Sequence, residues 1–213
     1  MLELKDINYR PATSKKAILK GISFNAHKGI PVLIAGASGS GKTSLMEVTS
    51  GIAKQNTGCI TWNTKVLSRR QRRWLCGVVF QFPERHFLGL TIAQELRLGH
   101  KRLSSVDQAK ALKEVGLDSV NLRMPPERLS GGQQRRLALA VQLLRKPKVL
   151  ILDEPTAGLD WSVRGEVLQL LKKISHDKVL IIVTHEIEQF ESWNAPTYKL
   201  HEGKIELMRK SAK

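Results

Sequence analysis

One stretch of eight residues limits the possible folds of this 213-residue chain more than any other. Positions 36–43 read Gly-Ala-Ser-Gly-Ser-Gly-Lys-Thr, between an apolar run at 32–35 and a helix expected to begin near Lys42. Glycines let a backbone curl so that its N–H groups and a helix N-terminus face an anion. Gly, four residues and Gly-Lys-Thr between strand and helix therefore predict a phosphate-binding loop in an α/β core.

The loop also assigns chemistry to particular side chains. Lys42 supplies a point charge to the β- and γ-phosphates of a nucleotide, and the Thr43 hydroxyl can ligate Mg²⁺. The residues expected to contact the nucleotide here are Gly36, Ala37, Ser38, Gly39, Ser40, Gly41, Lys42, Thr43 and Ser44.

The rest of the chain has the pattern of an α/β protein. Short apolar runs of strand length recur between segments of helical period, as in the buried parallel strands of an α/β sheet. These runs are residues 31–35, 77–80, 149–152 and 179–183. Three other segments alternate apolar and polar residues like antiparallel strands. They are residues 2–7, 18–26 and 59–62.

We expect a single domain, residues 1–213, with a P-loop NTPase core, an N-terminal antiparallel β-subdomain and an inserted α-helical subdomain at about 82–135. No run approaches the ~18–20 apolar residues of a membrane-spanning helix, and the N-terminus lacks the pattern of a signal peptide. The sequence therefore predicts a soluble chain.

The net charge and the cysteine content indicate which partners and which cellular compartment suit the chain. A formal net charge of +16 indicates acidic partners, whether nucleotide phosphates, nucleic acid or an anionic membrane surface, and charge alone does not choose among them. Cys59 and Cys76 lie in apolar segments with no CxxC motif and no His at metal-ligand spacing. We expect two buried thiols in a reducing compartment.

Two acids end the apolar run that begins at Lys148. Asp153 and Glu154 should emerge at the carboxyl edge of the sheet, where α/β proteins bind ligands. Asp153 can hold Mg²⁺ through water, and Glu154 can orient or deprotonate an attacking water. Downstream of a phosphate loop, this pair indicates catalysis rather than an ordinary strand end.

A second helix N-terminus follows Pro125-Pro126. Leu-Ser-Gly-Gly-Gln at 129–133 precedes an amphipathic helix at 134–145. The hydroxyl and the glycines suit an anion, but Ser130 could also be a simple helix cap. The residues expected to bind at this site are Ser130, Gly131, Gly132 and Gln133.

The phosphate loop, the 129–133 motif, the acid-ended strand and the pair Thr184-His185 occur in the order found in ABC-transporter ATPases. The chain resembles that family from about residue 2 to residue 205. The resemblance implies an ATPase that binds ATP and Mg²⁺ and works as a dimer, in which the 129–133 motif of one subunit closes over the nucleotide of the other. A homodimer and a heterodimer with a paralogous subunit both stay open.

The resemblance also implies roles for three further positions. Gln81 looks like the glutamine that approaches Mg²⁺ and the attacking water. The residues expected to bind the metal ion are therefore Thr43, Gln81 and Asp153. His185 looks like the histidine that contacts the γ-phosphate and helps to position Glu154. Tyr9 either stacks on adenine or packs within its strand.

Residues 80–85 and 90–96 are similar to the energy-coupling-factor group, which imports vitamins and metal ions, and residues 135–140 and 158–161 are similar to stand-alone cyanobacterial and plastid ABC ATPases. The implied partners are integral-membrane transporter subunits, and the implied location is the cytoplasmic face of a membrane, or the stroma in a plant or alga.

The alternative function is that of an ABC ATPase acting on nucleic acid or ribosomes. The chain lacks the coiled coil, zinc insertion or second cassette usual in such proteins, so nucleic acid is an unlikely partner.

One basic run stays open to several interpretations. Residues 68–74 read Ser-Arg-Arg-Gln-Arg-Arg-Trp. A solvated loop is the favoured interpretation, contact with lipid or a membrane partner is the second, and contact with nucleic acid is the third.

Overall fold

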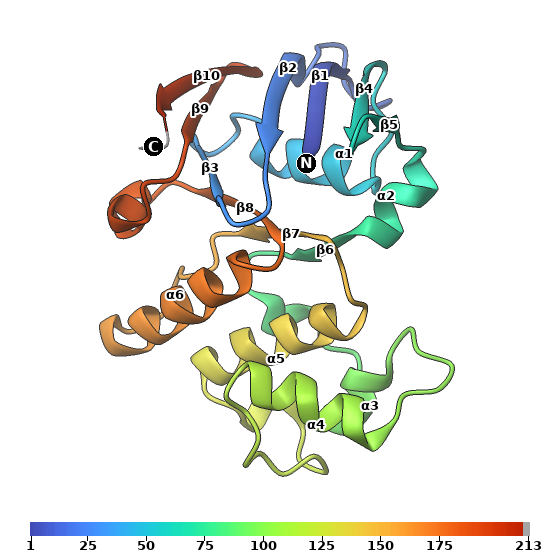
Figure 1. Ribbon diagram of the computed structural model, residues 1–213, viewed down its shortest axis with the longest axis vertical. Helices are drawn as coiled ribbons and strands as arrows, with labels where there is room; N and C mark the ends of the chain where they lie inside the picture. The colour runs from blue at the N-terminus through green and yellow to red at the C-terminus, as the bar shows by residue number, and fades with distance from the viewer. Residues whose placement is uncertain (211–213) are drawn as a thin grey trace. The chain divides into compact units, whose positions relative to one another are not determined.

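The computed structural model describes residues 1–210 and forms two compact units (Figure 1). The first unit comprises Met1–Val78, Pro147–Glu154 and the described part of Lys172–Lys213, and the second comprises Val79–Lys146 and Pro155–Leu171. The expected single domain with a lobe at about 82–135 stays a prediction, and its last residues, 211–213, lie outside the described residues. No helix within residues 1–210 is long and apolar enough to cross a membrane.

An antiparallel sheet begins the first unit, as predicted. Its strand order is β2-β1-β4-β5. The strands are β1 (Leu2–Tyr9), β2 (Leu19–Ala26), β4 (Thr57–Trp62) and β5 (Lys65–Val66). In β1, Leu2, Leu4 and Ile7 are at most 1% exposed, whereas Lys5 and Asp6 face solvent. One face of this sheet therefore packs against the hydrophobic core, and the other faces solvent.

A second sheet carries the fully buried strands. Its order is β10-β9-β3-β8-β7-β6. The strands are β3 (Val32–Ala35), β6 (Cys76–Val79), β7 (Val149–Asp153), β8 (Val179–Thr184), β9 (Thr197–His201) and β10 (Lys204–Arg209). β3 and β7 both run parallel to β8, and every residue of these three strands is buried. Their carboxyl ends share one edge of the sheet, which brings together the segments that follow them.

Two short helices of the first unit follow strands. α1 (Lys42–Ser50) begins after Gly41 and ends at Gly51, whose φ of 81° is left-handed. α2 (Arg69–Leu75) begins at Ser68, which forms a capping box with Gln71. The favoured solvated loop at 68–74 is therefore wrong, because the capping box starts a helix there.

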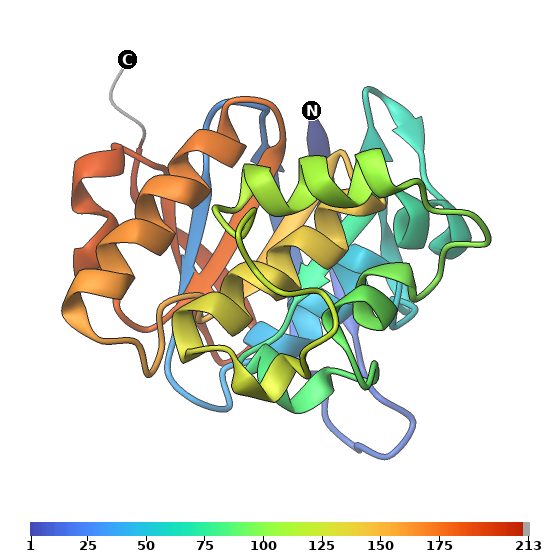
Figure 2. The same ribbon diagram turned by 90° about the horizontal axis from the view of Figure 1, so that it is seen from below.

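The second unit is helical. Its elements are η1 (Pro83–His86), α3 (Ile92–Arg97), α4 (Ser105–Glu114), η2 (Pro126–Arg128), α5 (Gly131–Leu144) and the greater part of α6 (Trp161–Ser175). A further 3-10 segment, η3 (Ile187–Trp193), belongs to the first unit. Figure 2 shows α4, in yellow-green, beside α5, in yellow. Leu112 of α4 and Leu139 of α5 are buried, as the apolar stripe of a packed helix requires.

One expectation about the cysteines is only half right. Cys76 is buried and its thiol lies 3.9 Å from the Thr49 carbonyl oxygen, but Cys59 is partly exposed. Cys59 lies near the start of β4, where the residues before it face solvent.

Gly51 provides a test of how closely α1 and α2 approach. A Cβ on Gly51 would lie 2.4 Å from the Arg69 carbonyl oxygen, whereas Gly29, with a similar φ of 85°, has open space around it. We expect Gly29→Ala to cost about 1–2 kcal/mol of unfolding free energy for the left-handed φ alone. Gly51→Ala should cost about 1–3 kcal/mol more because of the clash. Equal losses in urea denaturation would contradict this close approach.

Candidate functional site

The loop between β3 and α1 has little room for side chains. A Cβ on Gly36 would lie 2.6 Å from both the Leu200 carbonyl oxygen and Ser40 Oγ. Gly39 and Gly41 have φ values of 78° and 105°, which side chains rarely adopt. These three glycines therefore permit the curled backbone that leads into α1.

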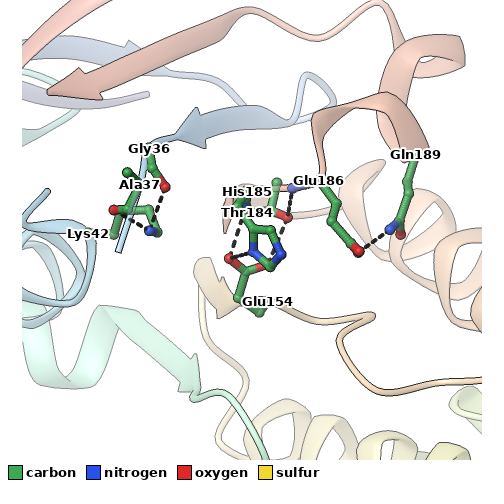
Figure 3. A network of polar contacts seen from close by, with 8 residues as sticks. All are labelled: Gly36, Ala37, Lys42, Glu154, Thr184, His185, Glu186 and Gln189. Carbon is green, nitrogen blue, oxygen red and sulfur yellow. Dashed lines mark hydrogen bonds and ion pairs between the residues drawn. The ribbon is translucent and has the colours of Figure 1, made fainter. Parts of the chain in front are cut away.

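The start of α1 is open to an anion. Gly41 provides no side-chain cap, and the first turn carries no acidic residue. Lys42 Nζ donates to the carbonyl oxygens of Gly36, at 2.7 Å, and Ala37, at 3.0 Å (Figure 3). Ser40 Oγ is buried and has no hydrogen-bond partner among residues 1–210. The loop and the start of α1 therefore provide N–H groups without a side-chain cap, a hydroxyl and an ammonium group.

Asp153 is the last residue of β7 and is 9% exposed. Burial raises the pKa of its carboxyl above the ordinary value, and the neighbouring Glu154 raises it further. Lys42 acts in the opposite direction and lowers this pKa. The phosphate-loop lysine and the acid-ended strand therefore share one electrostatic site within the first unit.

Glu154 is held by three polar groups of Thr184, the last residue of β8, and His185, which follows it (Figure 3). The Thr184 hydroxyl donates to Glu154 Oε2 at 2.8 Å, and the His185 backbone N–H donates to Oε1 at 2.9 Å. His185 Nδ1 lies 2.6 Å from the same Oε1. The Glu186 N–H donates to Thr184 Oγ1 at 3.0 Å, which leaves the Thr184 proton for Glu154.

Glu154 also has an unusual backbone. Its φ is 45°, in the left-handed region, and its side chain is only 6% exposed, compared with 58% for His185. The hydrogen bond and the charge of Glu154 raise the pKa of His185 above its ordinary value. A strained residue whose carboxylate is fixed at the end of a strand is typical of a functional position.

Gln81 lies in the second unit. It is exposed and precedes Phe82, whose φ of 52° turns the chain into η1. The Arg85 guanidinium lies 4.7 Å from the Phe82 ring centroid. The cation–π contact between Arg85 and Phe82 therefore stabilises the turn that directly follows Gln81.

Ser130 caps α5 in the second unit. Its Oγ accepts from the Gln133 N–H at 3.3 Å, and Gln133 Oε1 accepts from the Ser130 N–H at 2.9 Å. A Cβ on Gly132 would lie 2.2 Å from Val163 Cγ1, whereas one on Gly131 meets only Leu159 Cδ2, at 3.8 Å. Gly132 is thus required by packing against α6, and Gly131 leaves open surface.

The predicted residues therefore fall into two groups. The first unit holds the loop 36–44 together with Asp153, Glu154 and His185, and the second holds Gln81 and the motif 129–133. Tyr9, the last residue of β1, is half-buried opposite Leu19, and its stacking on adenine stays a prediction.

Two residues of these sites were not among the predicted ones. Thr184 orients Glu154, and Arg135, which is 3% exposed, donates to the Ala157 carbonyl oxygen at 2.9 Å. Their signals were weak: a threonine directly before a histidine at a strand end, and an arginine on the apolar side of a helix.

A glycine-rich loop between a strand and a helix, with an acid-ended parallel strand in the same sheet, defines a P-loop nucleoside triphosphatase. The chain belongs to the ABC transporter family, whose model, described as ABC transporter, matches residues 19–157. It is an ATP-binding subunit and an ATPase that energises transport. An ATPase acting on nucleic acid is not favoured.

Proteins with similar sequences are also named as ABC transporter proteins. The chain is 36% identical to ABC transporter I family member 11, chloroplastic, of Arabidopsis thaliana, over 96% of this chain and 79% of that protein. It is 32% identical to the energy-coupling factor transporter ATP-binding protein EcfA2 of Enterococcus faecalis, over 94% and 75% respectively.

Solved structures show the same fold. The structure of cbiO1 from Clostridium perfringens, part of the ABC transporter complex cbiONQ, has a TM-score of 0.87 at 31% identity and covers 97% of this chain and 86% of that one. A dimeric ATP-binding cassette bound to ADP and Pi has a TM-score of 0.81 at 26% identity, with coverage of 98% and 99%.

The contact between Glu154 and His185 predicts a pH effect. Replacing the carboxylate by an amide, Glu154→Gln, should lower the pKa of His185 toward its ordinary value near 6.5. Because the folded-state pKa is raised, the stabilisation from this pair is complete below about pH 6.5 and is lost as the pH rises through the folded pKa. An NMR titration of the imidazole, assigned with His185→Gln, measures the change. An unaltered pKa would contradict the contact.

Proposed function

We propose that the chain binds MgATP and hydrolyses it at composite sites formed by two ATP-binding subunits on a membrane transporter. The observation that carries this proposal is the fixed Glu154 carboxylate, held by Thr184 and His185 in the same electrostatic site as Lys42.

The residues present fit ATP and Mg²⁺. The uncapped N-terminus of α1 and the Lys42 ammonium suit the phosphates, with residues 36–44 as the binding loop. The Ser40 hydroxyl, which has no partner among residues 1–210, suits them as well. The buried Asp153, whose pKa burial raises, suits a nearby cation, and Thr43 and Gln81 would complete the metal set. Mg²⁺ is commonly held by one or two protein groups together with phosphates and water, and when bound it neutralises charge on the phosphates.

Glu154 is the proposed catalytic base. Its carboxylate accepts hydrogen bonds from Thr184 and His185, which fix its direction, and it can orient a water and take up its proton. The attacking oxygen then forms a bond to the γ-phosphorus while the bond to the leaving ADP oxygen breaks. His185, more than half exposed, can turn between Glu154 and the γ-phosphate.

The proposed dimer brings Ser130, Gly131, Gly132 and Gln133 of one subunit to the γ-phosphate held by the other. Support comes from the exposed Ser130 at the start of α5, from the open surface at Gly131 and from the dimeric relative bound to ADP and Pi. A pair of identical chains and a pair with a paralogue both satisfy this arrangement.

We also propose integral-membrane subunits as partners and a small solute, such as a metal ion or vitamin, as cargo. The similarity to energy-coupling-factor subunits and to a member of the cbiONQ complex supports this choice. The location would be the cytoplasmic face of a membrane, or the stroma for a plastid protein, in line with the chloroplastic relative.

Binding and turnover should separate in two variants. Lys42→Ala should weaken ATP binding, because it removes the phosphate-loop charge. Glu154→Gln should keep binding intact but lower ATP turnover by about 10²-fold or more, because it removes the base. Calorimetric titration and phosphate release measure the two effects. Turnover of Glu154→Gln within about threefold of wild type would refute the assignment of the base.

Two serines with identical capping boxes allow a matched test of the dimer. Ser68→Arg and Ser130→Arg should each lose a helix cap worth about 1 kcal/mol. In a Glu154→Gln background, ATP should convert monomer to dimer on size-exclusion chromatography. Ser130→Arg should abolish that shift because it places bulk at the composite site, and Ser68→Arg should keep it. If Ser130→Arg still dimerises in this background, and the single Ser130→Arg variant hydrolyses ATP like wild type, the motif is only a helix cap.

A further inference from the structure

The first unit contains a long stretch without acidic residues. Between Glu47 and Glu84 the chain has no aspartate or glutamate. The basic residues of this stretch are Lys54, Lys65, Arg69, Arg70, Arg72 and Arg73. α2 carries four of them on a single helix, at the periphery of the first unit and next to α1 (Figure 1).

Three of the four arginines donate hydrogen bonds to other groups of the first unit, and one of them, Arg72, is buried. Arg69 Nε and Nη2 donate to the carbonyl oxygens of Gly51, at 2.9 Å, and Ile52, at 2.6 Å, and Arg73 Nε donates to Gly51 at 3.0 Å. Arg72, which is 1% exposed, donates to Gln55 Oε1 at 2.9 Å. These groups satisfy carbonyls at and beyond the end of α1, where the helix dipole favours cations.

The remaining arginine faces outward. It is Arg70, whose side chain is exposed and makes no hydrogen bond or ion pair with any of residues 1–210. Trp74 lies one helical turn further along α2 and is 71% exposed, so that the two side chains share a face. Just before α2, Lys65 and Val66 of β5 are also exposed, Val66 by 66%. We call Arg70 and Trp74 the α2 surface.

The composition of the α2 surface points to a lipid interface. Tryptophan and arginine each have an apolar body and a polar or charged end, which suits the boundary between acyl chains and headgroups. The hydrogen bonds of Arg69, Arg72 and Arg73 fix the helix, so little conformational freedom is lost when its outer face binds. Positive charge without acidic neighbours in sequence complements an anionic leaflet.

We propose that the α2 surface contacts the anionic headgroups of the membrane on which this transporter ATPase works. The proposal rests on the family, since an ATPase that energises transport works beside a membrane, and it does not depend on the assignments of Glu154 or Ser130. It assigns membrane contact to this chain itself, in addition to contact through its partners.

Vesicle co-sedimentation tests the proposal. The wild-type chain should bind phosphatidylcholine vesicles containing about one third phosphatidylglycerol, should bind pure phosphatidylcholine much less, and should release as salt rises. Arg70→Gln should weaken binding about fivefold, and the double variant Arg70→Gln, Trp74→Ala more than about tenfold. ATP affinity and turnover should stay unchanged in both variants, because neither residue belongs to the nucleotide site.

Matched controls come from the second unit. Trp161 is 87% exposed and Arg123 is also exposed, so Trp161→Ala and Arg123→Gln remove the same side-chain types elsewhere. Both controls should bind vesicles like wild type. The fluorescence shift of the wild-type protein on anionic vesicles should disappear in Trp74→Phe and persist in Trp161→Phe.

Three results would overturn the proposal. The first is no binding of wild type to anionic vesicles, and the second is equal binding by the α2 variants and the controls. The third is Trp74-dependent binding to single-stranded RNA that exceeds vesicle binding, which would assign the surface to nucleic acid. If the ATPase variants behave as expected while these tests fail, the α2 proposal alone is wrong.

Discussion

The shared carboxyl edge of β3, β7 and β8 is the constraint on which the site in the first unit depends. Because the three strands are parallel and fully buried, the segments that follow them must emerge together. The phosphate loop, the two acids and the Thr184-His185 pair arise from three parts of the sequence and meet only through this geometry. The hydrogen bonds to Glu154 then fix its carboxylate, and they hold in place a residue whose backbone is strained in the left-handed region.

α1 links this site to the rest of the first unit through the two ends of its dipole. Its N-terminus is left without a side-chain cap, so the positive end is available to phosphate. Its C-terminus ends at Gly51, and arginines of α2 bind the carbonyls that follow, those of Gly51 and Ile52. The N-terminus of α1 is thus open to an anion, while its C-terminal end is held by α2.

Much of this arrangement could be predicted from the sequence. The glycine-lysine pattern, the apolar runs and the acids at a strand end depend on local spacing, and they predicted β3, α1, β7 and the fold class. Residues 68–74 were interpreted wrongly although Ser68 and Gln71 have the local spacing of a capping box. The bonds from Arg69 and Arg73 to the carbonyl oxygens of Gly51 and Ile52 are tertiary contacts that no local pattern predicts. Thr184 was missed for a similar reason, since its importance lies in which carboxylate it meets.

The capping box at Ser130 has a consequence for how a helix cap can also bind a ligand. In the box the serine oxygen accepts the Gln133 N–H, but the hydroxyl proton is not used by that bond. An anion approaching α5 would meet this proton together with the first free N–H groups of the helix. An aspartate caps a helix as well as a serine does, yet it would present negative charge and no proton. Capping of α5 and anion binding therefore do not compete at Ser130. Among the common capping residues, serine and threonine can accept the capping hydrogen bond and donate one to an anion through the same hydroxyl group.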